Sequence, residues 1–571
     1  MKRHAAIIVL VLLVTFPLYA EQGRPSETDR AVIHFSKEHL SAVARQRRII
    51  HHYDPGVGAL KYPDISIEEC RERTFKFVDA GDHQIDGIWW DMGAGDHAIY
   101  PSKLLIPIPA SGYKEWLAAG NDLLATFIAE TRTRNLEVFF SYRVNSTDYP
   151  TELPLKKQHP EWMINFNEDP AGPPDYHCPW ESKNHPSSVW NFALEPVRDF
   201  KVRVLREIAE NYDLDGFQLD FARICPVLPV GHQWEHRHSL TQFMRAVRNM
   251  LQEVAGQRGK PFLLAVKIPE TLSGCHFDGM HIETWVEDRL VDILILGSRS
   301  IEPDIRSFQQ LVRGSHIRVY PSHDDHHASD GYKYASLDVL RGITSNWWQQ
   351  GATGIQIFNF AVMERRAAVL EIGSQESLRR KDKTFVVGRR AGGHPWIFGY
   401  PEQRQTQTSM YHNSNMVAQL PARLGNHASG TTFVHLNIGD DVNADASHVD
   451  AIRLRVLLSD PFNKDLPAEQ CIEPAIARPT VYSGDEHVTV PITKQLVKRV
   501  ELRLNNIHLG QAAVEKGWLT FSVKPEQLAV GENLVRVRLR GADNDTDEPI
   551  TIEKLELKVS YRSIADRERG G

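Results

Sequence analysis

The stretch Leu214-Asp215-Gly216-Phe217-Gln218-Leu219-Asp220-Phe221-Ala222-Arg223 decides the predicted fold. Its bulky apolar side chains alternate with smaller or polar ones, which is the period-two pattern of a β-strand. Gln218 and Asp220 therefore share one face of the strand, and the bulky apolar side chains share the other. Because a buried carboxylate needs a partner, we expect Arg223 to hold Asp220 ionised. An Asp220–Arg223 pair without a catalytic role is the structural alternative.

Working outward, seven similar apolar runs occur between about residues 45 and 370. The eight predicted strands are residues 49–53, 85–90, 136–142, 214–221, 262–268, 291–296, 317–320 and 354–360. Stretches of helical period lie between them, at residues 113–134, 196–211, 240–255, 305–313 and 336–350. Eight strands alternating with helices predict an α/β fold, a (β/α)8 barrel over residues 21–375.

The pattern changes after about residue 375. Runs of period two follow one another, separated by Gly, Asn and Asp turns, at residues 432–436, 452–458, 500–504, 519–523, 534–539 and 552–559. This spacing predicts an all-β C-terminal domain, an antiparallel β-sandwich over residues 385–571.

Composition excludes several classes of protein. Hydrophobic residues make up 42% of the chain and charged residues 24%, so it is not mostly disordered. The net charge is −7 without a basic block, which argues against a nucleic-acid partner. The chain has 12 Trp and 26 His, residue types that sugar-binding clefts use. No feature of the sequence indicates an oligomeric state.

The N-terminus predicts export. Residues 1–20 hold a short basic start, an apolar run from Ala5 to Pro17, and Ala20 at the expected cleavage site, as in a signal peptide. We therefore expect a secreted or periplasmic protein with no membrane span in the mature chain. The five cysteines, Cys70, Cys178, Cys225, Cys275 and Cys471, show no CxxC spacing, which excludes a cysteine-rich zinc site. A Cys225–Cys275 disulfide and free buried cysteines both fit the sequence.

Acidic residues end several of the predicted strands. In a (β/α)8 barrel the carboxyl ends of the strands gather around one axis and carry the active site. The candidate catalytic residues are Asp220 on the fourth strand, Glu270 after the fifth, and Asp324 and Asp325 after the seventh. Glu283 competes with Glu270 for the role of acid.

Further polar and aromatic residues lie near the same strand ends. The candidate substrate-binding residues are Trp90, Asp91, Tyr142, Arg143, Trp162, Arg223, Lys267, His323 and Asn359. Cleavage of a glycosidic bond needs one carboxyl to protonate the leaving oxygen and a second to attack or to activate water. Acids and aromatic platforms at one barrel mouth therefore predict a carbohydrate substrate, without a cofactor or a metal. Trp89 is interpreted as core packing.

The stretch Asp215-Gly216-Phe217-Gln218-Leu219-Asp220 resembles the fourth-strand signature D-G-F-R-x-D of the alpha-amylase superfamily, with Gln in place of Arg. It is also similar to the D-G-[IV]-x-[FL]-D strand of the glycosyl hydrolase-like barrel families of secreted bacterial proteins. The segment His159-Pro160-Glu161-Trp162 resembles their H-P-E-W segment. The resemblance covers about residues 45–370.

This resemblance implies roles for individual residues. Asp220 would be the nucleophile or its equivalent, Glu270 the fifth-strand acid, and Asp324 or Asp325 the seventh-strand stabiliser. Since the first-strand motif of the amylases is absent, a glycoside hydrolase-like barrel is the family that the residues support. We expect a glycoside hydrolase that cleaves a polysaccharide or an oligosaccharide.

Two alternatives come from other functional classes. In a metal-dependent amidohydrolase or deacetylase, His51, His52, Lys267 and the histidines of residues 323–327 would bind the metal. Adjacent histidines on a strand point to opposite faces, however, and the eighth strand ends in Asn359 rather than an acid. In a non-catalytic carbohydrate-binding protein, the cleft persists without a usable acid pair.

Overall fold

The computed structural model describes most of the chain from residue 33 onward. The described residues are 33–54, 65–91, 96–108, 113–145, 153–164, 189–222, 227–229, 231–297, 300–325, 332, 334–360, 362–389, 418–424, 431–460, 467–473, 476–477, 487–488, 491–540 and 550–562. The predicted signal peptide, Cys178, Cys225 and Arg223 lie outside these residues. Residues Phe35–Gly571 form one compact unit.

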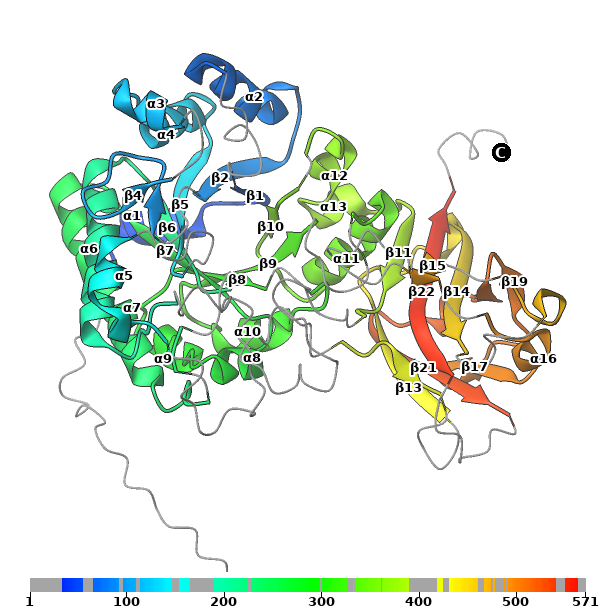
Figure 1. Cartoon of the computed structure of the whole chain (residues 1–571). Coiled ribbons are helices and arrows are strands. Elements are labelled where there is room, and N and C mark those ends of the chain that lie inside the picture. The colour runs from blue at the N-terminus through cyan, green and yellow to red at the C-terminus, as the bar shows by residue number, and fades with distance from the viewer. Residues whose placement is uncertain are drawn as a thin grey trace, which may run out of the picture. The chain divides into compact units, whose positions relative to one another are not determined.

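Eight parallel strands close into a barrel, which confirms the predicted fold (Figure 1). In the order of the barrel they are β1 (Ile49–Tyr53), β10 (Ile355–Phe358), β9 (Arg318–Asp324), β8 (Ile293–Leu296), β7 (Leu263–Ile268), β6 (Gly216–Asp220), β5 (Glu137–Arg143) and β2 (Ile85–Asp91). Each predicted apolar run supplies one strand. Two short strands, β3 (His97–Ala98) and β4 (Ile106–Pro107), pair with each other outside the barrel.

Helices connect the barrel strands. They are α1 (Lys37–Ala44), α2 (Ile67–Asp79), α3 (Tyr113–Ala118), α4 (Leu123–Thr133), α5 (Pro154–Gln158), η4 (Pro160–Trp162), α6 (Glu195–Asn211), α7 (Arg237–Arg258), α8 (Leu272–Phe277), α9 (Ile282–Glu287), α10 (Ile305–Leu311), α11 (Leu337–Gln349), α12 (Arg366–Glu371) and α13 (Gln375–Leu378). The single helix predicted over residues 113–134 is wrong, because two helices form there. Gly120 adopts a φ of 84°, and the Asp122 side chain caps the first turn of α4.

The strand β9 is longer than predicted. It continues four residues past Tyr320 to Asp324, and its register pairs Pro321 with Leu296 and Asp324 with Phe358. Proline usually marks the edge or the end of a strand, which is why the sequence pattern stopped there. The extension brings Asp324 into the strand itself.

Alternation along the strands sorts side chains into an inner and an outer set. The inner apolar side chains, named the barrel floor here, are Ile50, Trp89, Phe139, Leu263, Ala265, Ile293, Ile295 and Tyr320. Trp89 stacks on Phe139 with ring centroids 4.3 Å apart, so its predicted packing role is confirmed. Beside the floor, the buried Arg47 guanidinium donates to both carboxylate oxygens of Glu137, at 2.7 and 2.6 Å.

The C-terminal part consists of antiparallel sheets, as predicted. One sheet has the order β11-β22-β14-β20-β19, with β12 on β22, and a second has the order β13-β21-β17-β18. Their bounds are β11 (Lys383–Val386), β12 (Ala422–Arg423), β13 (Thr431–Ile438), β14 (Val449–Ser459), β17 (Val500–Leu504), β18 (Ile507–His508), β19 (Ala513–Glu515), β20 (Trp518–Ser522), β21 (Gly531–Leu539) and β22 (Thr551–Tyr561). Apolar side chains of both sheets form one core, including Val434, Leu454, Leu502, Val535 and Leu557.

Three smaller findings complete the fold. The short pair β15 (Ile476–Ala477) and β16 (His487–Val488), the helix α16 (Lys494–Val497) and the turns η6 (Ala446–His448), η8 (Ala468–Gln470) and η9 (Pro525–Gln527) lie between the C-terminal strands. Cys70, Cys275 and Cys471 are buried free thiols, so Cys275 forms no disulfide. Among the described residues, no helix is both long and apolar enough to span a bilayer.

Candidate active site

Charged side chains point inward where the barrel strands end. On β6 the inner face is fixed by Gln218, whose amide contacts Ser141 on β5 and Gln356 on β10 inside the barrel. Asp220 lies two residues farther along and faces the same way, as the alternation predicted. Counting by twos in the same way along the other barrel strands finds the charged side chains that point inward at the strand ends. They are called the mouth cluster here and are Asp54, Asp91, Arg143, Asp220, Lys267 and Asp324.

Asp220 lies between two cations in this cluster. The sheet register pairs it with Arg143 on β5 and with Lys267 on β7. Neighbouring strands are about 4.8 Å apart, so both cationic side chains start beside the carboxylate. Asp220 is 3% exposed, and its Oδ1 accepts a hydrogen bond from the backbone N–H of Ala222 at 2.9 Å. The expected partner, Arg223, lies outside the described residues.

Arg143 connects three strand ends. Its Nε donates to Asp91 Oδ2 at 2.8 Å and its Nη2 donates to Asp54 Oδ2 at 2.5 Å. Two charge-assisted bonds from one rigid guanidinium fix its plane. Arg143 is therefore held in place next to Asp220 by the first and second strands.

A layer of neutral polar side chains lies beneath the mouth cluster. Ser322 Oγ donates to Gln356 Oε1 at 3.1 Å, and Gln356 Nε2 donates to Gln218 Oε1 at 2.7 Å. Gln218 Nε2 then donates to Ser141 Oγ at 2.7 Å and lies 3.4 Å from His52 Nδ1. This hydrogen-bonded chain crosses the barrel interior and separates the charged mouth from the apolar floor.

His52 is buried between that layer and the mouth cluster. Its ring stacks on Phe358, with centroids 4.4 Å apart, and its Nε2 lies 3.7 Å from Asp91 Oδ2. Burial holds the pKa of His52 well below its ordinary value, and the nearby charges of Lys267 and Arg143 lower it further. His52 is therefore neutral at physiological pH.

Glu270 lies beyond the end of β7 rather than on the strand. A Cβ at Gly297, which follows β8, would come within 3.1 Å of the Glu270 Cβ. The side chain is 1% exposed, and its charge contributes, after burial and Asp278, to a raised pKa of the Cys275 thiol. Glu270 thus occupies the rim between β7 and β8. Glu283, its competitor, lies on α9 and pairs with His276 at 2.8 Å.

The residues after Tyr320 separate into an inner and an outer group. Asp324 follows Ser322 on the inner face of β9, whereas His323 points outward and lies 6.5 Å, between ring centroids, from Trp347 of α11. Asp325 contacts Arg365 in a short ion pair and lies 3.5 Å from His323. Asp325 and His323 therefore belong to the helical layer and not to the mouth cluster.

Two other predicted contacts lie on outer faces. Trp90 packs against Phe127 of α4, and its Nε1 donates to Thr131 Oγ1 at 3.0 Å. Tyr142 points toward α6, where Lys201 Nζ donates to its hydroxyl at 3.0 Å. Both positions follow from the alternation of side chains along a strand, because Trp90 and Tyr142 each directly precede a residue that points inward.

Two further predicted residues, Trp162 and Asn359, lie outside the barrel strands. Trp162 belongs to η4 and stacks on His159 at 4.1 Å between ring centroids. Asn359 directly follows β10 and has a left-handed backbone with a φ of 47°.

Three residues of the site were not predicted. Asp54 and His52 lie at the end of the first strand, where only His51 and His52 were considered, as metal ligands. Phe358 lies on the eighth strand. Lys267 Nζ lies 4.4 Å from the centroid of the Phe358 ring. Counting by twos along a strand links His52 to Asp54 and Phe358 to Gln356, so the alternation assigns all three residues to inner faces.

In the part of the chain that the structure describes, no three His, Cys, Asp or Glu side chains are arranged to hold a metal ion. His51 and His52 point to opposite faces of β1, as the alternation predicted, with His51 packed on Phe77 of α2 at 4.7 Å between ring centroids. His326 and His327 lie outside the described residues.

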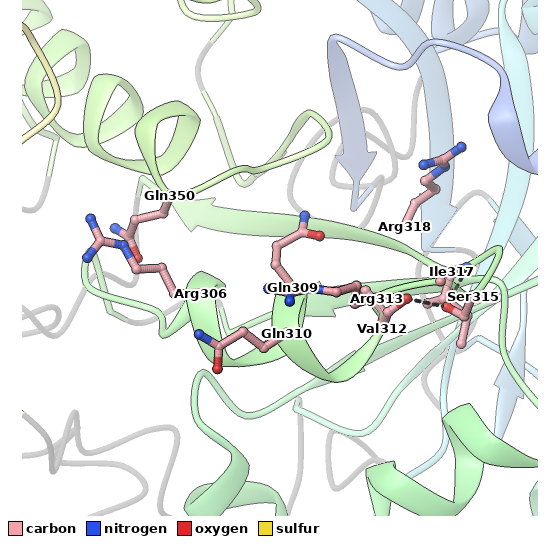
Figure 2. Close-up of a pocket in the computed structure, with 10 residues that line it drawn as sticks. Arg306, Gln309, Gln310, Val312, Arg313, Ser315, Ile317, Arg318 and Gln350 are labelled. Atoms are coloured by element: carbon pink, nitrogen blue, oxygen red, sulfur yellow. Dashed lines mark hydrogen bonds between the residues drawn. The ribbon is translucent and has the colours of Figure 1, made fainter.

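Two hollows lie at the opposite end of the barrel. One, of about 480 Å³, is lined by residues 306–318 and Gln350, which precede β9 and β10 (Figure 2). Its arginines, Arg306, Arg313 and Arg318, are spread along the hollow and do not converge on one point (Figure 2). The other, of about 750 Å³, includes Glu137 and Leu263, the first residues of β5 and β7. Neither hollow contains a predicted site residue.

Comparisons with known proteins give one family match and several distant structural matches. Residues 60–233 match the family model of glycosyl hydrolase-like 10. No curated protein matches the chain. Among solved structures, alpha-L-fucosidase isoenzyme 2 from Paenibacillus thiaminolyticus is 14% identical over 58% of this chain and 48% of its own, with a TM-score of 0.37. The chain thus aligns with about half the length of that enzyme.

Two further solved structures are similar at the same low level. An alpha-L-fucosidase from Vibrio sp. strain EJY3 is 11% identical over 91% of this chain and 98% of its own, with a TM-score of 0.36. A GH20 exo beta-N-acetylglucosaminidase from Vibrio harveyi is 13% identical over 52% of this chain and 42% of its own, with a TM-score of 0.29. The chain is a closed eight-stranded barrel with C-terminal antiparallel sheets, and its segment from after the first barrel strand to beyond the fourth matches the glycosyl hydrolase-like 10 family.

Proposed function

We propose that this protein is a glycoside hydrolase, exported from the cell, that cleaves a polysaccharide or an oligosaccharide. One observation carries the proposal: Asp220 points into the barrel mouth, and the register places it between Arg143 and Lys267. An ionised carboxylate held between cations is what a nucleophile or a general base requires. The match of residues 60–233 to a glycosyl hydrolase-like family supports the same reaction class.

The reaction needs a second carboxyl group. In the proposed mechanism Glu270 donates a proton to the leaving oxygen as the bond from that oxygen to the anomeric carbon breaks. Asp220 either attacks the anomeric carbon, and water later displaces it, or takes the proton from a water that attacks directly. Asp324, which points inward from β9, is the alternative acid.

The other mouth residues bind the sugar in this proposal. Asp91 and Asp324 supply acceptors for hydroxyl groups, and Arg143 and Lys267 supply donors. Trp90, Tyr142 and His323 are not included, because their side chains lie on outer faces of the barrel.

A screen of purified protein against bacterial and algal glycans tests the proposal. The variants are Asp220→Asn, Glu270→Gln and Asp324→Asn, and Asp450→Asn in an exposed position of β14 is the matched control. We expect Asp220→Asn to lower kcat/KM by about 10³-fold, and the true acid variant by about 10²–10⁴-fold. The control is expected to equal the wild type.

The outcomes separate the candidate functions. If wild type and Asp220→Asn bind the same glycan and neither turns it over, the protein is a carbohydrate-binding protein and not a hydrolase. If Asp324→Asn loses activity and Glu270→Gln keeps it, Asp324 is the acid. Export is tested separately by N-terminal sequencing of the protein recovered outside the cytoplasm, with Glu21 as the expected first residue.

A further inference from the structure

The mechanism above assigns no role to His52, a buried titratable side chain beside the mouth cluster. His52 is fully buried at the end of β1, and its Nε2 has no hydrogen-bond partner among the described residues. A polar group buried without a partner costs free energy, so its position calls for an explanation. The atom faces the mouth cluster, since Asp91 Oδ2 lies 3.7 Å away.

The polar layer beneath His52 decides which ring nitrogen carries the proton. Two orientations of the Gln218 and Gln356 side-chain amides satisfy the hydrogen-bonded chain, because a serine hydroxyl can both donate and accept a hydrogen bond. In the first orientation Gln218 Nε2 donates to His52 Nδ1, so the ring proton is on Nε2. In the second orientation both amides are flipped, and His52 Nδ1 donates to Gln218. The lone pair of Nε2 then faces the Asp91 carboxylate. Repulsion between that lone pair and the carboxylate disfavours the second orientation.

Charged groups on five strands face the ring. They are Asp54 on the same strand end, Asp91, Arg143, Asp220 and Lys267. Burial, together with Lys267 and Arg143, outweighs Asp220 and Asp54, which favour protonation, so the pKa of His52 stays low. The imidazole is therefore a neutral donor and not an acid–base group.

We propose that His52 is a positioning residue of the candidate active site: its Nε2–H faces Asp91 and holds the Asp91–Arg143 pair in the orientation that keeps Arg143 beside Asp220. The links are the 3.7 Å approach of Nε2 to Asp91 Oδ2 and the 2.8 Å bond from Arg143 Nε to the same oxygen. The effect on turnover rests on the proposed glycosidase function, whereas the proton position and the Arg143 contact do not.

Packing alone would also explain a ring stacked on Phe358. Two substitutions separate the roles. His52→Gln keeps an N–H donor near the place of Nε2 and loses the ring, and His52→Phe keeps the ring and loses the donor. His52→Asn, which reaches only the place of Nδ1, is the matched control for His52→Gln.

The first measurement needs no substrate. In ¹⁵N-histidine-labelled protein, the signal that His52→Phe removes is expected to show a neutral ring protonated on Nε2 at every pH from 5 to 8. In ¹⁵N-arginine-labelled protein, the Arg143 Nε–H signal, assigned with Arg143→Lys, is expected to move in His52→Phe and His52→Asn and to stay near the wild-type position in His52→Gln. A ring protonated on Nδ1, a ring charged at pH 5, or an Arg143 signal unmoved in His52→Phe overturns the proposal.

The second measurement is turnover of the glycan found in the screen. We expect kcat about tenfold lower in His52→Phe and His52→Asn with KM nearly unchanged, and kcat within about threefold of the wild type in His52→Gln, because the 3.7 Å approach of an N–H group to the Asp91 carboxylate is lost or kept. Full activity of His52→Phe beside an impaired His52→Gln assigns a packing role and refutes the proposal. If the wild type cleaves no glycan, the glycosidase function fails, and the ¹⁵N spectra still decide the position of the proton.

Discussion

Along β5 the inward side chains change from Phe139 to Ser141 to Arg143, and along β9 they change from Tyr320 to Ser322 to Asp324. The same strands thus build an apolar floor at their amino ends and a charged mouth at their carboxyl ends. A layer of neutral hydrogen bonds lies between the two. Alternation fixes which side chains face inward, and the position along the strand fixes their chemistry.

Buried charges are also arranged differently at the two ends of the barrel. Near the floor, Arg47 and Glu137 form a closed pair, and the remaining Arg47 N–H groups donate to backbone carbonyls, including that of Val43. In the mouth cluster four carboxylates face two permanent cations. Charge that is fully paired contributes to the fold, whereas unbalanced charge in a barrel mouth is kept for binding or catalysis.

The largest expected effect comes from breaking the Arg47–Glu137 ion pair beside the barrel floor. Glu137→Gln leaves the buried Arg47 guanidinium without its counter-charge, and we expect a loss of about 3–5 kcal/mol in the free energy of unfolding. Denaturant titration measures the loss. Arg206→Ala, which breaks an exposed pair with Glu253, is the control and is expected to cost less than about 1 kcal/mol. A loss of the same small size in Glu137→Gln would remove the distinction between floor and surface.

The next effect is at the mouth and appears in turnover. Arg143→Gln removes the fork that joins Asp91 and Asp54 and displaces the cation beside Asp220. Misplacement of a group in an active site by about 1 Å costs about 10²-fold. We therefore expect kcat/KM on the cleaved glycan to fall about 10²-fold. An unchanged kcat/KM would show that Arg143 has only a structural role.

A smaller effect is expected from pH and comes from the outer face of β1. Burial lowers the pKa of His51 to about 3, so the folded protein keeps this ring neutral while the unfolded chain protonates it below about pH 6.5. Stability from this group is full above pH 6.5 and falls as the pH decreases toward 3. Between pH 7 and pH 5 the wild type should lose about 2 kcal/mol more than His51→Phe.

Denaturant titration of both proteins at the two pH values measures this difference. His52 is present in both and cancels. Equal losses would mean that the His51 ring is accessible to protons in the folded state.

The fold was predictable because its signal is repeated. Eight apolar runs of strand length, each followed by a stretch of helical period or a loop, leave few architectures open. The errors arose where local chemistry interrupts a run. Gly120 and Asp122 end one helix and start another inside a single periodic stretch, and Pro321 lies within β9 although proline usually ends a strand.

The site was only partly predictable, because residues that are neighbours in the sequence do not all point to the same side of a strand. Three adjacent pairs, Trp90 with Asp91, Tyr142 with Arg143 and His323 with Asp324, were assigned to the same rim. Adjacent side chains on a strand point to opposite faces, so only one of each pair reaches the mouth. Which one does so follows from the register of the closed barrel, which one strand alone does not reveal.

The most direct test of the account compares the stability of Asp220→Asn with its turnover. If the mouth charges serve function rather than the fold, removing one of four carboxylates brings the cluster closer to electrical balance with its two cations. We predict a free energy of unfolding equal to the wild type or up to about 1 kcal/mol higher, while kcat/KM falls about 10³-fold. A loss of stability of about 3 kcal/mol or more would contradict the account, because it would place Asp220 in a structural ion network like that of Arg47 and Glu137.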